Sequence, residues 1–204
     1  MDKDKDYFYI LKEAVRSETK IKSSTFIGSL SYAENVEQAK SFISSISTEY
    51  KDATHNCWAY ITGKNADIFH SSDNGEPSGT AGKPILNTLQ KYRLTNTVAV
   101  VTRYYGGVKL GVRGLIDAYS ESAELAIKSG EIIPLIEMSE YFITTSYDFS
   151  EQFKYQVKSF NSEILDIQYS DKVDFIIQIE KSLNYDLENY LKEMSNLGKL
   201  SLIT

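Results

Sequence analysis

Residues 73–84 read DNGEPSGTAGKP, and residues 103–115 read RYYGGVKLGVRGL. Together these two stretches hold seven of the eleven glycines in the chain. From Gly75 to Leu115 there are six basic residues and only one acidic residue, Glu76. Glycine lets the backbone approach a ligand closely and adopt positive φ, and fixed positive charge attracts anions. The sequence therefore predicts an anion-facing surface in a chain whose net charge is −6.

The segment between the two stretches indicates how they are held. Pro84 suits the first turn of a helix whose apolar face would include Ile85 and Leu89. Residues 97–102, TVAVVT, are rich in β-branched and apolar residues, which predicts a buried central strand. A second helix is expected over about residues 115–129. Each glycine stretch thus precedes a helix, whose first N–H groups and partial positive charge favour anions.

The residues before the first stretch predict strands and one helix. Extended segments are expected at Tyr7–Glu18, Thr25–Tyr32, Cys57–Ile61 and Ala66–Phe69. Asn35 is placed as a helix cap, with Gln38 positioned as in a capping box. Apolar residues then recur at helical spacing as far as Tyr50, which predicts one buried helical face.

A domain boundary is expected around Pro134, giving domains of residues 1–134 and 135–204. Beyond it the pattern predicts strand, helix, strand, strand, helix and strand at 140–147, 151–160, 164–169, 173–180, 185–195 and 200–203. This β-α-β-β-α-β order is that of a ferredoxin-like domain. We therefore expect a two-domain α+β protein.

Composition and charge narrow the class of protein. No apolar run approaches the roughly 18–20 residues that span a membrane. Residues 1–7 have no apolar core for a secretory signal, and the single cysteine, Cys57, cannot form an internal disulfide. We expect a soluble, cytoplasmic protein without membrane contact. Residues 1–134 carry 16 basic and 16 acidic residues, and residues 135–204 carry 6 and 12. The acidic second domain is therefore expected to repel nucleic acid and to contact either a protein or the first domain.

Two familiar catalytic motifs do not match. A phosphate-binding P-loop needs glycine where Pro77 stands and serine or threonine where Pro84 stands. Ser71, Ser72 and Ser78 lie near the histidines, but no G-x-S-x-G elbow surrounds them. Nucleotide hydrolysis by a P-loop and serine hydrolysis are both disfavoured.

A metal or acid–base site is conceivable where the two histidines, His55 and His70, lie near Asp73 and Glu76. The spacings match no zinc motif, so structural roles are favoured and neither metal nor cofactor is expected. If the protein were an enzyme, His55, Asp73 and Glu76 would be the groups to test.

The anion-facing surface gives more specific expectations. Its phosphate contacts are expected to be Lys83, Arg103, Lys109 and Arg113. Either Tyr104 or Tyr105 would stack on a base. Close backbone approach is expected at Gly79, Gly82, Gly106, Gly107 and Gly111. The alternative is that the glycines serve only turns and packing, and that one of the two tyrosines belongs to the core.

Three strings, HNCWAY at 55–60, SDNGEPSGTAGKP at 72–84 and VTRYYGGVKLG at 101–111, closely resemble the Impact family, whose bacterial branch is called YigZ. The resemblance implies a first domain like the second domain of a small-subunit ribosomal protein, also found in elongation factor G. It implies a ferredoxin-like second domain and a link to translation control. Two residues depart from the family pattern: Asn74 stands where a second aspartate is usual, and Arg113 where glycine is common.

The predicted function is therefore a non-enzymatic, RNA- or ribosome-binding role linked to regulation of translation. Two alternatives stay open: an enzyme of unknown chemistry that acts on a phosphorylated or nucleotide-like ligand, and a pure protein-interaction module.

Overall fold

The computed structural model describes residues 7–203, and the chain divides into two compact units, residues 1–135 and 136–204. The predicted boundary after residue 134 lies one residue before this division. Residues 1–6, on which the expectation of no secretory signal mainly depends, lie outside the described range. Among residues 7–203, no helix combines the length and apolar character that crossing a bilayer requires.

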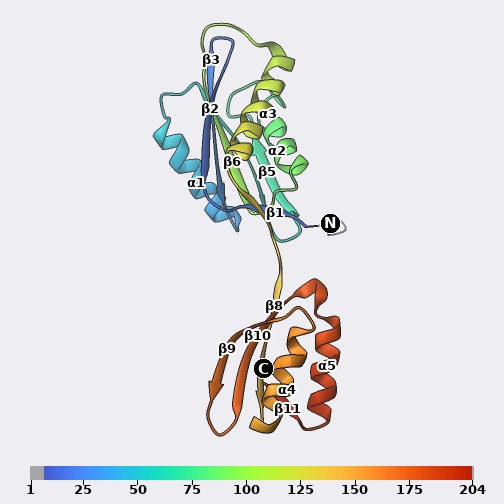
Figure 1. The fold of residues 1–204 in the computed structure, drawn as a ribbon. Helices are drawn as coiled ribbons and strands as arrows, with labels where there is room; N and C mark the ends of the chain where they lie inside the picture. The colour runs from blue at the N-terminus through green and yellow to red at the C-terminus, as the bar shows by residue number, and fades with distance from the viewer. Residues whose placement is uncertain (1–6, 204) are drawn as a thin grey trace. The chain divides into compact units, whose positions relative to one another are not determined.

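An antiparallel five-stranded sheet forms the centre of the first unit (Figure 1). In spatial order its strands are β2 (Val15–Ile21), β3 (Ser24–Tyr32), β6 (Thr97–Tyr104), β4 (His55–Thr62) and β5 (Ile68–Ser72). The predicted central strand is confirmed: β6 occupies the middle of the sheet and is buried from Thr97 to Arg103. It extends two residues beyond the predicted Thr102, and this extension carries Arg103 into the sheet.

Helices cover both faces of this sheet (Figure 1). On one face, α1 (Val36–Glu49) contributes Ala39 to a small core with Tyr60 and Val98. On the other face lie α2 (Gly82–Lys91) and α3 (Gly111–Ser129). The larger core between these helices and the sheet includes Phe26, Leu30, Ala99, Val101, Ile85, Leu89, Tyr119 and Ala123.

The ends of the helices show one confirmed prediction and one error. Asn35 Oδ1 accepts a 2.9 Å hydrogen bond from the Gln38 N–H, as predicted. The reciprocal bond of Gln38 Oε1 comes from the N–H of Glu34 rather than from Asn35. The second helix was expected to begin near residue 115, but α3 begins one turn earlier, at Gly111. Gly111 has a positive φ, but none of the residues after it in α3 does, so the helix continues from this point.

The first extended segment is divided in the structure. Where one strand was expected over Tyr7–Glu18, β1 (Tyr9–Leu11) is separate from β2 and pairs with β7 (Ile132–Pro134) in a two-stranded antiparallel sheet. The partner of β1 lies more than 120 residues away in the sequence, so no local pattern indicates that β1 and β2 are separate strands.

The second unit has the predicted β-α-β-β-α-β order. Its elements are β8 (Met138–Thr145), α4 (Tyr147–Lys158), β9 (Glu163–Tyr169), β10 (Val173–Glu180), a 3₁₀ turn η1 (Lys181–Leu183), α5 (Tyr185–Asn196) and β11 (Leu200–Ile203). The antiparallel strand order is β11-β8-β10-β9. Alternate residues of β10 from Val173 to Ile179 are buried, and they pack in a core with Phe153 and Leu187.

Candidate functional site

A buried ion pair lies where the first glycine stretch meets the end of β6. The guanidinium Nη1 of Arg103 donates a 2.5 Å hydrogen bond to Glu76 Oε1, and the two side chains are only 6% and 4% exposed. Nη2 of Arg103 donates to Ser24 Oγ at 3.3 Å. The strand pairing places Arg103 between Phe26 of β3 and His55 of β4. The fold thus brings a carboxylate from a loop onto a cation at the end of the central strand.

Tyr119 and Cys57 enclose the inner side of this pair. The Tyr119 hydroxyl donates to Glu76 Oε1 at 2.9 Å. The Cys57 thiol donates to the Asp73 carbonyl at 2.9 Å and lies 3.4 Å from Tyr119 Oη. Burial raises the pKa of Cys57 to about 12 and also raises the pKa of Tyr119. Both groups are therefore protonated at neutral pH, and Cys57 is not poised as a nucleophile.

Sequence reasoning assigned Tyr119 no part in the site. The available signal was its spacing of four residues from both Leu115 and Ala123 in the helix expected over about 115–129, which favours a buried position. Nothing in the sequence pointed to its contact with a carboxylate 43 residues earlier in the chain.

The two histidines, His55 and His70, lie in different parts of the first unit. His55 Nδ1 lies 2.9 Å from the Asn74 carbonyl oxygen, which can only accept, so this nitrogen donates its proton. Its Nε2 lies 3.9 Å from Glu76 Oε1. His70 is paired with Tyr60 across β4 and β5, on the sheet face that α1 covers, and it packs against Trp58 and Tyr60. Only His55 therefore belongs to the site.

Asp73 organises the first glycine stretch. Its carboxylate accepts hydrogen bonds from the N–H groups of Gly79, Ala81 and Gly82 at 2.8–2.9 Å. Burial alone would raise the pKa of Asp73, but these bonds to the charged form outweigh that effect and lower it. The carboxylate is thus engaged at the start of α2, which accounts for Asp73 without a catalytic role.

The glycines divide into two groups. A Cβ at Gly82 would meet the Ser72 backbone at 2.7 Å, and one at Gly106 would collide with the Ser23 backbone. These two positions serve close packing inside the protein, which corrects the expectation that they face a ligand. By contrast, Gly79, Gly107 and Gly111 have positive φ and no heavy atom of the described chain within 4 Å of a Cβ position.

The predicted phosphate contacts also divide. Lys83, Lys109 and Arg113 are exposed, and their side chains make no ion pair or hydrogen bond within the part of the chain that the structure describes. Arg103 differs, because its buried guanidinium is already paired with Glu76. The expectation that Arg103 belongs to the exposed cationic surface is thereby corrected.

The two adjacent tyrosines have different surroundings. The Tyr104 hydroxyl donates to Asp52 Oδ1 at 3.0 Å, and the residue is half-buried. Tyr105 is 44% exposed, and the Arg103 guanidinium lies 5.2 Å from its ring centroid. Tyr105 is therefore the better candidate for stacking on a ligand.

A pocket of about 370 Å³ lies next to the buried ion pair. Its polar lining comes from Glu76, Arg103 and Lys109, and Tyr105 forms part of the wall. Apolar lining residues are Pro77, Leu110, Val112 and Leu115. The helix α3 begins at this pocket, and no side chain within residues 7–203 caps its first N–H groups. The site therefore combines an apolar enclosure, a buried ion pair and free helical N–H donors.

The Impact N-terminal domain, as a family, matches residues 22–127 of the chain. This chain belongs to the Impact family. The Impact family member YvyE of Bacillus subtilis is 35% identical over 93% of this chain and 87% of its own length. The family member YigZ of Escherichia coli is 40% identical over 62% of this chain and 63% of its own. A solved structure described as that of a hypothetical protein is 30% identical, covers 97% of this chain and 96% of its own, and superposes with a TM-score of 0.63.

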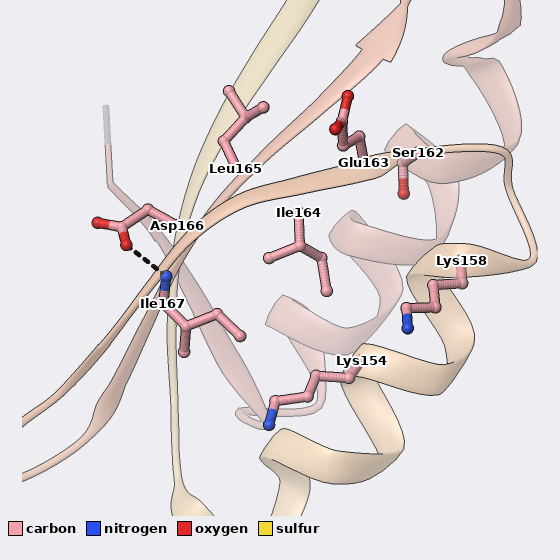
Figure 2. A pocket seen from close by; sticks show the side chains of 8 residues that line it. All are labelled: Lys154, Lys158, Ser162, Glu163, Ile164, Leu165, Asp166 and Ile167. Atoms are coloured by element: carbon pink, nitrogen blue, oxygen red, sulfur yellow. Dashed lines mark hydrogen bonds between the residues drawn. The ribbon is translucent and has the colours of Figure 1, made fainter.

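The Impact domain match contains the whole candidate site, from Ser24 to Tyr119. A second hollow, of about 580 Å³, lies outside this match, between α4 and β9 of the second unit (Figure 2). Lys154 and Lys158 project from α4 beneath the strand, but Lys154 is engaged by Glu151 and Tyr169. Asp166 accepts a hydrogen bond from the Ile167 N–H of the same strand. Its other charged lining residues are Lys158, Glu163 and Asp166, so this hollow lacks the excess of positive charge found on the glycine stretches.

Proposed function

We propose that this Impact family protein is a non-enzymatic RNA- or ribosome-binding protein linked to the regulation of translation. The observation that carries the proposal is the set of exposed, unpaired cations Lys83, Lys109 and Arg113 on the glycine stretches that also present Tyr105. Some other cations of the same unit are paired with acids: Lys12 with Glu131, Arg16 with Glu49, and Lys91 and Lys128 with Glu124. Lys20, Lys22, Lys40 and Lys51 are also exposed, but they lie outside the glycine stretches.

This combination suits single-stranded nucleic acid. Unpaired cations bind phosphates and release counterions, which supplies affinity without sequence preference. An exposed aromatic ring adds stacking on a base, worth about 1–3 kcal/mol per base. The free N–H groups at the start of α3 add donors for an anion.

Further parts of the proposal rest on the family resemblance. We propose that the first unit has the fold of the second domain of a small-subunit ribosomal protein, as in elongation factor G, and that the second unit is ferredoxin-like. The strand order β11-β8-β10-β9 supports the latter. We place the protein in the cytoplasm, where its free Cys57 would stay reduced. The acidic second unit is proposed to meet a protein partner.

Co-sedimentation with ribosomes and binding of labelled RNA at increasing salt test the proposal. The affinity for single-stranded RNA should fall with salt, and Lys109→Ala should flatten the log–log slope by about 0.7. Lys128→Ala is the matched control, because Lys128 lies at the other end of α3 and is paired with Glu124. Absence of binding at low salt, or an unchanged slope in Lys109→Ala, would refute the proposal.

One observation favours a second candidate function, an enzyme that acts on a phosphorylated or nucleotide-like ligand. His55 Nε2 lies 3.9 Å from the Glu76 carboxylate, which in turn lines the pocket. A histidine so placed could take up a proton during a reaction. Turnover of a ribonucleotide mixture, followed by NMR, would support this candidate if it depended on pH and disappeared in His55→Ala.

A further inference from the structure

The floor of the Impact-domain pocket is a neutralised pair rather than a positive charge. Arg103 and Glu76 both line it, and their charges cancel at 2.5 Å. A phosphate that reached Arg103 would also meet the Glu76 carboxylate, and like charges in a dry site repel strongly. The floor is therefore unsuited to a bare anion, although the exposed Lys109 also lines the pocket and Arg113 lies in the first turn of α3, which begins there.

The floor nevertheless has unused hydrogen-bonding capacity. Arg103, Tyr119 and His55 all approach the same oxygen of Glu76, Oε1, and Oε2 has no hydrogen-bond partner in the described range. The Nε–H of Arg103 is buried and likewise has no partner among residues 7–203. Because that N–H has no accessible surface, it is not offered to a ligand, whereas Glu76 lines the pocket. The floor therefore offers one hydrogen-bond acceptor, Glu76 Oε2.

The walls restrict the shape of that ligand. Tyr105 and four apolar side chains enclose about 370 Å³, which lies in the range of small-molecule sites. The Arg103 guanidinium lies over the Tyr105 ring, so the aromatic wall is held next to the floor. Apolar walls with a carboxylate acceptor at the floor match a flat heterocycle that carries N–H groups on its edge.

We propose that this pocket receives one unstacked base of a single-stranded RNA. The base would stack on Tyr105 and donate an N–H of its edge to Glu76 Oε2, while the flanking phosphates contact Lys109 and Arg113. Proteins recognise single-stranded RNA in this way, by stacking splayed bases on aromatic rings and hydrogen-bonding their edges. The inference rests on the proposed function and assigns the buried and exposed residues of the site separate roles, for base and for phosphate.

Fluorescence anisotropy with two RNAs of equal length tests the inference: one with bases, and one abasic throughout but with the same phosphates. The RNA with bases should bind about tenfold more tightly, while both show the same salt slope. Tyr105→Ala should abolish the difference, and Tyr105→Phe should keep it. Tyr155→Ala is the control, because Tyr155 is 80% exposed on α4 of the other unit.

The outcomes separate this inference from the function on which it rests. If both RNAs bind equally, or if Tyr105→Ala leaves the difference intact, the base pocket is refuted while RNA binding stands. If neither RNA binds at low salt, the proposed function fails and the base pocket fails with it. Tyr105 rather than Glu76 is substituted because Glu76 also supports the fold, so its loss would confuse binding with stability.

Discussion

Glu76 and Arg103 have both been removed from water, and each is compensated mainly by the other. Desolvating two charges costs several kcal/mol per ion, which their attraction offsets only when the geometry is good and further hydrogen bonds are made. Tyr119 and Ser24 supply those further bonds. The pair therefore does little for net stability while intact, but removing one partner leaves the other charge buried alone.

Glu76→Ala is accordingly expected to lower the free energy of unfolding by about 3–5 kcal/mol. Urea denaturation followed by circular dichroism measures the change. Glu49→Ala provides the comparison, because it removes an acid that is also paired with an arginine, Arg16, but at the exposed surface. That control should change stability little, since solvent screens the pair. Equal effects of the two substitutions would contradict the buried-pair argument.

The Asp73 carboxylate predicts how stability responds to acid. Its pKa is lowered in the native state, so the stabilisation is complete above the ordinary aspartate pKa of about 3.9 and is lost as pH falls through the lower native pKa. Asp73→Asn should therefore destabilise the protein by a constant amount from pH 7 to about 5, and by less below about pH 4.

Urea denaturation of the unsubstituted protein and of Asp73→Asn, repeated at a series of pH values, measures the difference in their free energies of unfolding. Asp117→Asn, which alters an exposed carboxylate on α3, serves as the control and should show no comparable change. A difference for Asp73→Asn that stayed constant down to pH 3 would argue against the charged carboxylate as the cause.

At this scale the sequence predicted the composition of the site better than its geometry. Lys109 and Arg113 were expected to be available cations, and they are exposed. Arg103 was misplaced because its neighbours, two tyrosines and two glycines, are typical of an exposed loop. Its burial depends on Glu76, which lies 27 residues earlier, and on the extension of β6. Neither condition is visible in a local pattern.

Among the elements, the turn between β2 and β3 and the loop after β6 fit closely together. Gly106 lies against the Ser23 backbone and has no room for a Cβ, whereas the next residue, Gly107, has open space but a φ of +85°. The two glycines are thus required for different reasons, the first for packing and the second for backbone conformation.

Gly106→Ala is expected to destabilise the first unit more than Gly107→Ala. The second substitution should cost about 1–2 kcal/mol, the usual penalty for a left-handed alanine. The first adds a steric collision that the backbone must move to relieve. Thermal unfolding of the two variants measures the order, and a larger effect of Gly107→Ala would show that the close fit of the two loops is wrong.

Elements with a strong local signal were predicted well. The strand Val173–Glu180 alternates apolar and polar residues, and the cap at Asn35 has its partner three residues away, so both are encoded within a short window. The pairing of β1 with β7 and the early start of α3 were missed. The first depends on a contact between distant segments, and the second on the positive φ of Gly111, the residue at which α3 begins.

For the whole molecule, the two units have separate cores and different charge. Residues 1–135 carry equal numbers of acidic and basic residues, and the net charge of −6 lies entirely in residues 136–204. Each unit has its own cluster of buried apolar side chains. The exposed cations Lys83, Lys109 and Arg113 and the net negative charge therefore belong to different compact units.

A fragment of residues 1–135 is expected to fold alone and to bind single-stranded RNA at least as tightly as the full chain, with the same salt slope. Removing six net negative charges lessens repulsion, and every residue of the candidate site is retained. Residues 136–204 alone should fold but not bind. Circular dichroism and anisotropy measure both fragments. RNA binding confined to the second fragment would overturn the assignment of the surface.

Cys57 is a built-in chemical probe of local opening in the first unit. Only a thiolate reacts readily with an alkylating reagent, and the Cys57 thiol is fully buried with a pKa of about 12. It also donates to the Asp73 carbonyl, so a reagent such as iodoacetamide must wait until the segment after β5 moves aside. Because the chain has a single cysteine, its rate of alkylation reports that opening without any engineered label. A ligand bound at Glu76 would stabilise the closed form and slow the alkylation of Cys57. The alkylation rate of the unmodified protein would therefore report whether the pocket is occupied.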